Sequence, residues 1–275
     1  MNLNEIIILI LIIILFIIII NFCKNLYTEF FVNNSKLNLP IYYINMDKDK
    51  DRNEFIKDQL KDNNYKRIAG VDVKNQTKYK IDARSKYKWP LKDSEIGCTL
   101  AHLNAIHAFL NDNHEYGLIC EDDANFELIN YWNISLQDII NLLNKKDSNW
   151  TTCMLYNTYI TNEKNYKVIE LNDNRALFGT VAYLISRKYA IYIKELTNNF
   201  TIFKNDKDVD ARADYYLYYN KKSNPYLLYP SIINLNKNTN SNIEPNNKNR
   251  DKPNFIKSDR IKDYLVNNNI TLENK

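Results

Sequence analysis

Residues 116–127 read Tyr-Gly-Leu-Ile-Cys-Glu-Asp-Asp-Ala-Asn-Phe-Glu, an apolar run of strand type that ends at three consecutive carboxylates. Because burying an unpaired carboxylate is costly, these acids are expected at a strand end, in a cleft or against a cation. In open α/β sheets, ligands bind at the carboxyl ends of the strands. An acidic turn that faces solvent is the alternative interpretation.

The order of the three acids suggests a metal site. Side chains alternate along a strand, so Glu121 and Asp123 are expected to face one way and Asp122 the other. Two carboxylates on one side suit a hard divalent cation that also holds a phosphate.

Strand and helix patterns alternate on both sides of this stretch, which favours an α/β layered sheet. In residues 94–110 the apolar side chains keep to one helical face, and Glu95 and His102 share a stripe at its edge. Residues 74–92 read as a loop. Strands are predicted at 39–45, 65–69, 118–120, 151–156, 166–171, 179–185 and 226–229, and further helices at 51–63, 135–144, 186–196 and 208–218.

Composition excludes several classes of protein. The net charge of +4 over 275 residues comes from interspersed lysines and acids, so nucleic-acid binding is not suggested. The four cysteines have no Cys-x-x-Cys spacing, so neither a zinc site nor a disulfide scaffold is expected. Cys98 and Cys120 are expected to pack as small apolar side chains. The four glycines are expected where the backbone tolerates nothing larger.

An apolar run over residues 6–20, continued by Phe22 and Cys23, dominates the N-terminus. The eighteen residues from Ile6 to Cys23 are just long enough for a bilayer core, and Glu5 before them argues against the rival, a cleavable signal peptide. The sequence therefore predicts a transmembrane anchor at 1–23, a polar spacer at 24–38 and one domain at 39–275. The expected location is the membrane, with a single-pass N-terminal anchor and the side of the membrane open.

Seven segments stand out in order along the chain. They are IYYINMDKDKDR with Asn45 and Arg52, RIAGVD with Asp72, LKDSEIGCTLAHL with Glu95, Gly97, Cys98 and His102, LICEDDANFE with the acidic triplet, FGTVAYLISRKYA with Gly179 and Thr180, ADYYL with Asp214, and SNI at 241–243. Together they resemble the segments of glycosyltransferase family 25, which includes bacterial lipooligosaccharide galactosyltransferases and procollagen galactosyltransferases. The resemblance covers a core at 39–243 and leaves a polar extension at 244–275. Ala101 stands where the family has a serine, and Asn242 replaces an acid.

The resemblance implies a GT-A-like nucleotide-sugar-binding domain with a mixed central sheet. It also implies a nucleotide-sugar donor, in most cases a UDP-hexose of galactose or glucose, and inversion at the anomeric carbon. Mn²⁺ or Mg²⁺ on Glu121 and Asp123 would offset the charge of the diphosphate, and Asp122 would bond donor hydroxyls. The acceptor would be a hydroxyl of a glycan, a glycolipid or a protein.

Inversion needs a general base for the acceptor hydroxyl, and Asp214 is expected in this role, with Asp210 one helical turn earlier as the rival. Other residues are expected to bind the donor or acceptor. For each of them the alternative is a purely structural role, such as an ion pair or a contact with a backbone carbonyl. These residues are Asn45, Arg52, Asp72, Glu95 and His102.

Two other functions stay open. The departures at Ala101 and Asn242 permit a non-catalytic relative that binds a sugar nucleotide or a glycan. Acidic strand ends also hold metals in phosphoesterases. Such sites usually have several further His or Asp ligands, and this chain has only three histidines, which disfavours this function.

Overall fold

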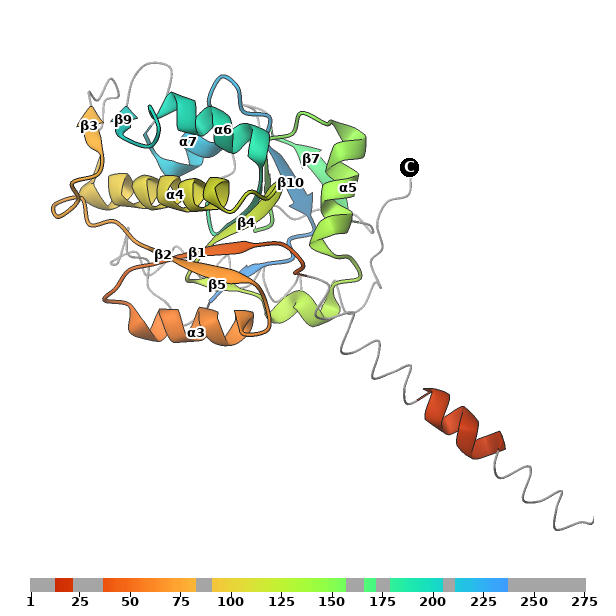
Figure 1. Ribbon diagram of the computed structural model, residues 1–275. Coiled ribbons are helices and arrows are strands. Elements are labelled where there is room, and N and C mark those ends of the chain that lie inside the picture. Colours follow the sequence, from red (N-terminus) through yellow and green to blue (C-terminus); the bar gives the residue numbers. More distant parts are fainter. Residues whose placement is uncertain are drawn as a thin grey trace, which may run out of the picture.

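A mixed β-sheet lies at the centre of the folded domain (Figure 1). The structure is a computed structural model that describes residues 13–21, 37–82, 91–156, 166–171, 179–204 and 211–236. The large sheet has seven strands in the order β2-β1-β4-β8-β6-β10-β7, and two small sheets pair β11 with β5 and β3 with β9. The strands are β1 (Ile41–Asn45), β2 (Tyr65–Ala69), β3 (Lys80–Asp82), β4 (Tyr116–Glu121), β5 (Ala124–Asn125), β6 (Thr152–Met154), β7 (Lys167–Glu170), β8 (Ala182–Ser186), β9 (Ile202–Lys204), β10 (Tyr226–Tyr229) and β11 (Asn234–Leu235).

Strand direction changes across the large sheet. β1 is parallel to β2 and β4, and β10 is parallel to β6, whereas β8 is antiparallel to β4 and β6 and β7 is antiparallel to β10. Asn45 pairs with Ala69 and Ile44 pairs with Glu121, so β1, β2 and β4 end together. Because β8 runs the other way, the residues before it come to the same end of the sheet.

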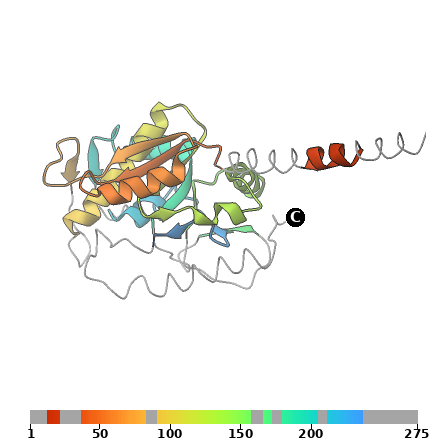
Figure 2. The same cartoon turned by 90° about the horizontal axis from the view of Figure 1, so that it is seen from below.

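Helices cover both faces of this sheet, which confirms the predicted α/β fold with a mixed central sheet. α3 and α5 pack on one face, and α4, α6 and α7 on the other. Figure 1 shows α3 and α4 on opposite sides of β1 and β2, and Figure 2, seen from below, brings α3 to the front. The helices are α3 (Lys50–Leu60), α4 (Asp93–Asn111), the 3-10 helix η2 (Glu127–Tyr131), α5 (Leu136–Lys146), α6 (Arg187–Leu196) and α7 (Ala213–Tyr218).

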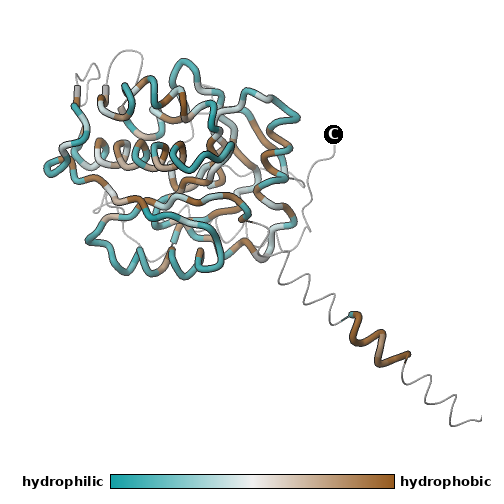
Figure 3. The backbone as a smooth tube through the Cα atoms, in the orientation of Figure 1, coloured by the Kyte–Doolittle hydropathy of each residue, from teal (hydrophilic) through white to brown (hydrophobic). Residues whose placement is uncertain are grey.

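Successive strand residues enter the two cores in turn. Tyr43 and Cys120 belong to the core under α3 and α5, and Tyr42 and Ile119 to the core under α4 and α6. A sheet buried on both faces has near-continuous apolar strands, which Figure 3 shows as brown segments at the centre of the domain. The same alternation decides which face each site residue at a strand end reaches.

The helix predicted at 94–110 is α4, in which Leu100, Leu103 and Ile106 of the apolar stripe are fully buried. Gly97 lets the first turns of α4 approach the loop after β2. A Cβ at this position would lie 2.4 Å from the carbonyl oxygen of Val71, closer than real contacts allow.

Local capping signals are confirmed at α5. The hydroxyl of Ser135 accepts a hydrogen bond from the backbone N–H of Asp138, and the Asp138 carboxylate accepts one from the backbone N–H of Ser135. This reciprocal pair satisfies two N–H groups that a helix start otherwise leaves unpaired.

One predicted loop contains a strand. β3 lies inside the segment 74–92 and pairs in parallel with β9, more than a hundred residues along the chain. A three-residue strand has too little periodicity to be read locally, because its partner supplies the pattern of hydrogen bonds.

The predicted membrane anchor is corrected by the structure. The described part of the apolar N-terminal run is a helix over residues 13–21, brown in Figure 3, with exposed side chains such as Phe16. Among the described residues, no helix is both long and apolar enough to cross a bilayer. This finding contradicts the predicted single-pass membrane anchor, and that prediction is therefore wrong.

Candidate functional site

A cleft of about 400 Å³ lies at the carboxyl ends of β1, β2 and β4. Its walls come from these strand ends, from the loop after β2 and from the first turns of α4. The residues that line it include Asn45, Arg52, Asp72, His102, Glu121, Asp122 and Asp123. A cavity of about 410 Å³ at the other end of the same strands is lined by Pro40, Asn64 and Tyr116 and by none of the predicted site residues.

β4 ends at Glu121, and Asp122 and Asp123 form a turn. Asp122 accepts a hydrogen bond of 2.6 Å from the Asn45 amide and pairs with Arg52. Arg52 also lies 2.9 Å from Asp123. Asp123 thus shares the α3 side with Asp122 instead of facing the same way as Glu121, because strand alternation stops where the strand ends.

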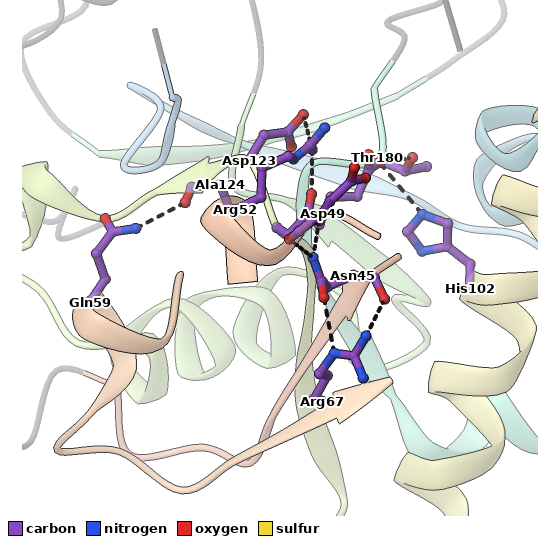
Figure 4. Close-up of polar contacts among 11 residues, drawn as sticks. Asn45, Asp49, Arg52, Gln59, Arg67, His102, Asp123, Ala124 and Thr180 are labelled. Carbon is purple, nitrogen blue, oxygen red and sulfur yellow. Dashed lines mark hydrogen bonds and ion pairs between the residues drawn. The ribbon is translucent and has the colours of Figure 1, made fainter. Parts of the chain in front are cut away.

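Glu121 faces α4. It follows Ile119 by two residues on β4, and residues two apart on a strand point to the same face of the sheet. Its Oε1 accepts a hydrogen bond of 2.6 Å from the Thr180 hydroxyl and lies 3.5 Å from His102 Nε2. The other ring nitrogen of His102 lies 3.1 Å from the Tyr183 hydroxyl. Figure 4 shows His102 reaching from α4 and Thr180 from the segment before β8 toward the same point.

The three acids have different electrostatic environments. Burial raises the pKa of Asp122 to about 6, with Arg52 and Asn45 opposing the rise. Burial and then the charge of Glu121 raise the pKa of Asp123 to about 7, with Arg52 opposing. Burial would also raise the pKa of Glu121, but the contacts with His102 and Thr180 hold it below the usual value. The triplet therefore concentrates negative charge at a place where a cation would relieve it.

Two residues that hold parts of the site in place were not predicted from the sequence, and both are labelled in Figure 4. Arg67 on β2 donates to the side-chain oxygen of Asn45 at 3.0 Å and to its backbone carbonyl at 3.1 Å. Gln59 on α3 accepts from the N–H of Phe126 at 2.7 Å and donates to the carbonyl of Ala124 at 3.3 Å. Gln59 thereby ties the segment after the acidic turn to α3. Only strand pairing and helix packing bring these residues to the site, so no local pattern marks them.

Two predicted site residues have local partners. The carboxylate of Asp72, exposed at the cleft, accepts from the backbone N–H of Lys74 at 3.1 Å and from the amide of Asn75 at 2.7 Å. Glu95 accepts from the backbone N–H of Lys92 at 2.8 Å, at the start of α4. This contact turns the carboxylate toward the helix start.

The predicted base Asp214 lies at the start of α7 and accepts a hydrogen bond of 3.0 Å from the backbone N–H of Gly179. Gly179 has a φ of +124°, a conformation that only glycine adopts readily. Gly179 precedes Thr180, whose hydroxyl donates to Glu121, so Asp214 lies close to the Thr180 contact with Glu121 but is not among the residues that line the cleft. Asp210 and Asn242 lie outside the described residues.

Comparison with known proteins identifies the family. The family model described as glycosyltransferase family 25 (LPS biosynthesis protein) matches residues 38–211, which is more than half of the 275 residues and includes the β1, α4 and β4 segments of the cleft. A search of curated proteins found no match. On the family match, the chain belongs to glycosyltransferase family 25 and is a glycosyltransferase.

Proposed function

We propose that this protein transfers a hexose, galactose or glucose, from a UDP-sugar to a hydroxyl acceptor with inversion, using a GT-A-like domain. The acceptor belongs to a glycan, a glycolipid or a protein. The observation that carries the proposal is the placement of Glu121, Asp122 and Asp123 in one 400 Å³ cleft with Asn45 and Arg52. This end of parallel strands is where α/β sheets bind ligands.

The cleft offers positive groups for a nucleoside diphosphate. Arg52 and Lys48 line it. Asn45, fixed by Arg67, donates its amide to Asp122 and to the carbonyl of Asp49. It thereby orients the Asp122 carboxylate, which can accept from a donor hydroxyl.

The acidic turn fits a hard divalent cation. Asp123 Oδ1 is buried without a hydrogen-bond partner, and the charge of Glu121 reaches Asp123 strongly enough to raise its pKa. In the proposal, Glu121 from the α4 side and Asp123 from the α3 side hold Mn²⁺ or Mg²⁺ between them, across the end of β4. Such a cation, when bound, offsets the charge that develops on the departing diphosphate.

Transfer requires one proton acceptor for the attacking hydroxyl. In the proposed step, Asp214 takes the proton as the acceptor oxygen bonds to the anomeric carbon, and the bond to the diphosphate breaks on the opposite side. The Gly179 N–H holds the Asp214 carboxylate in place. Asp210 remains the rival base from the sequence.

The proposal is tested by incubating the purified full-length chain with each of several UDP-sugars, Mn²⁺ and a panel of hydroxyl acceptors. UDP release that depends on the acceptor, and product of inverted anomeric configuration by NMR, are expected. Asp123→Asn should lower turnover by about 100-fold or more. Asp58→Asn on α3, where the side chain is 81 % exposed, is the matched control and should not change it.

Three outcomes count against parts of the proposal. Full activity of Asp123→Asn removes Asp123 as a metal ligand. Donor binding without transfer to any acceptor supports the non-catalytic relative. Hydrolysis of phosphodiesters without sugar transfer supports a phosphoesterase.

A further inference from the structure

Three ligand types meet on the α4 side of the cleft. Cys98 Sγ, a ring nitrogen of His102 and a carboxylate oxygen of Glu121 all lie within 4.8 Å of one another. Cys98 and His102 are four residues apart on α4, so they share one helical face, and Glu121 reaches them from the end of β4. All three residues line the cleft.

His102 directs a ring nitrogen to this point, and that nitrogen has no hydrogen bond. The residue is 1 % exposed, and its Nε2 has no hydrogen-bond partner. Nε2 lies 3.5 Å from Glu121 Oε1, an ion-pair distance that is long for a hydrogen bond. Two ligands of a tetrahedral ion with bonds near 2.1 Å are about 3.4 Å apart. The spacing of His102 and Glu121 is therefore already that of two ligands on one metal.

Both residues also have the outer contacts that ligands of a metal usually have. The Tyr183 hydroxyl lies 3.1 Å from Nδ1 of His102 and fixes the ring orientation. The Thr180 hydroxyl donates to Glu121 Oε1 at 2.6 Å and fixes the carboxylate. Such second contacts orient the ligands of a metal and are important for its affinity.

We propose that Cys98, His102 and Glu121 bind a borderline transition-metal ion of the Zn²⁺ or Co²⁺ class, with its fourth position open to the cleft. A thiolate and an imidazole select such ions over Mg²⁺ and Ca²⁺. Three protein ligands and an open position are typical of zinc sites that bind water or a substrate. On binding, the Cys98 thiol proton passes to solvent and a sulfur–metal bond forms.

This site goes beyond the proposed function and differs from the proposed Mn²⁺ or Mg²⁺ site. The two ligand sets share only Glu121, and one contains sulfur and nitrogen where the other has oxygen alone. Metal binding at this site is measured without a donor sugar. A failure of sugar transfer therefore leaves this inference intact, and a failure of metal binding at Cys98 leaves the proposed sugar transfer intact.

The test is a Co²⁺ titration of the chelator-treated full-length chain, followed by absorption spectroscopy. We expect a near-ultraviolet sulfur-to-cobalt charge-transfer band together with visible bands of a tetrahedral ion. Cys98→Ser should abolish the charge-transfer band, and His102→Gln should weaken Co²⁺ affinity by about 100-fold or more. Cys153→Ala, at a fully buried cysteine in β6, is the matched control and should keep the band.

A second measurement covers the case in which a variant does not fold. In the unmodified chain, Zn²⁺ should protect Cys98 from alkylation by iodoacetamide, as read by mass spectrometry of its peptide. Cys98 is partly exposed, so the thiol is within reach of the reagent. Equal alkylation with and without Zn²⁺, a missing charge-transfer band in the folded chain, or a band that survives Cys98→Ser would overturn the proposal.

Discussion

The guanidinium of Arg52 lies 2.9 Å from the carboxylate of Asp123 and also pairs with Asp122, so one cation on α3 offsets two acids of the turn after β4. All three side chains are largely buried. The single guanidinium thereby offsets the repulsion between two adjacent carboxylates.

Removing this guanidinium should destabilise the fold and reduce transfer. Arg52→Met leaves two adjacent buried carboxylates without their cation, which costs about 3 kcal/mol and lowers the melting temperature by about 6–12 °C. Arg52→Lys keeps one charge but cannot hold both acids, so an intermediate loss is expected. Calorimetry measures the shift, with Lys57→Met at an exposed position of α3 as the control. An unchanged melting temperature in Arg52→Met contradicts the pairing.

The hydroxyl of Thr180 is expected to matter through Glu121. Thr180→Val keeps the shape of the side chain and removes a hydrogen bond to a carboxylate, an interaction of about 1.5–3 kcal/mol. We expect kcat/KM for sugar transfer to fall by about 10–100-fold in Thr180→Val and to remain near normal in Thr180→Ser. Equal activity of the two variants would show that Glu121 needs no such support.

Two glycines at the cleft should respond differently to a methyl group. In Gly97→Ala the new Cβ meets the backbone carbonyl of Val71 at 2.4 Å, so α4 or the loop must move, at about 1–3 kcal/mol. In Gly70→Ala it meets the Met46 sulfur at 2.3 Å, and that flexible side chain can rotate away. Urea unfolding of both variants tests this difference. A larger loss in Gly70→Ala would contradict the rigid contact at α4.

His107 should make stability depend on pH. Burial, and then the charges of Lys78 and Lys194, lower the pKa of this histidine, whose ring stacks on Phe200. The unfolded chain therefore binds the proton at higher pH than the folded chain. Stability should decline as pH falls through the unfolded-state pKa and level off below the folded-state pKa.

Urea unfolding between pH 8 and pH 5 measures this decline. His107→Gln should lack the His107 component, so the stability advantage of the unmodified chain over this variant should shrink as the pH falls. His114→Gln, at an exposed position after α4, is the control. A pH-independent difference between the unmodified chain and His107→Gln rules out the histidine as its source.

The pattern of apolar and polar residues by itself predicted the positions of several strands and helices. Tyr65–Ala69 and Tyr226–Tyr229 are strands at the predicted bounds, and α4 differs from its prediction by one residue at each end. The Ser135 and Asp138 pair marked a helix start correctly. These features are local, because periodicity and capping depend on neighbours within a few residues.

Tertiary structure decided which side chains meet. Arg52 was expected to bind the donor or the acceptor or to form an ion pair, and folding places it against Asp122 and Asp123 at the end of another element. Cys98, predicted to pack as a small apolar residue, lies with His102 at a carboxylate from another strand. Such meetings depend on strand order and on the packing of α3 and α4 against opposite faces of the sheet. A local sequence pattern predicts which face of the sheet a side chain points to. The partner that the side chain meets on that face is set by the assembled sheet, because the partner comes from a distant part of the sequence.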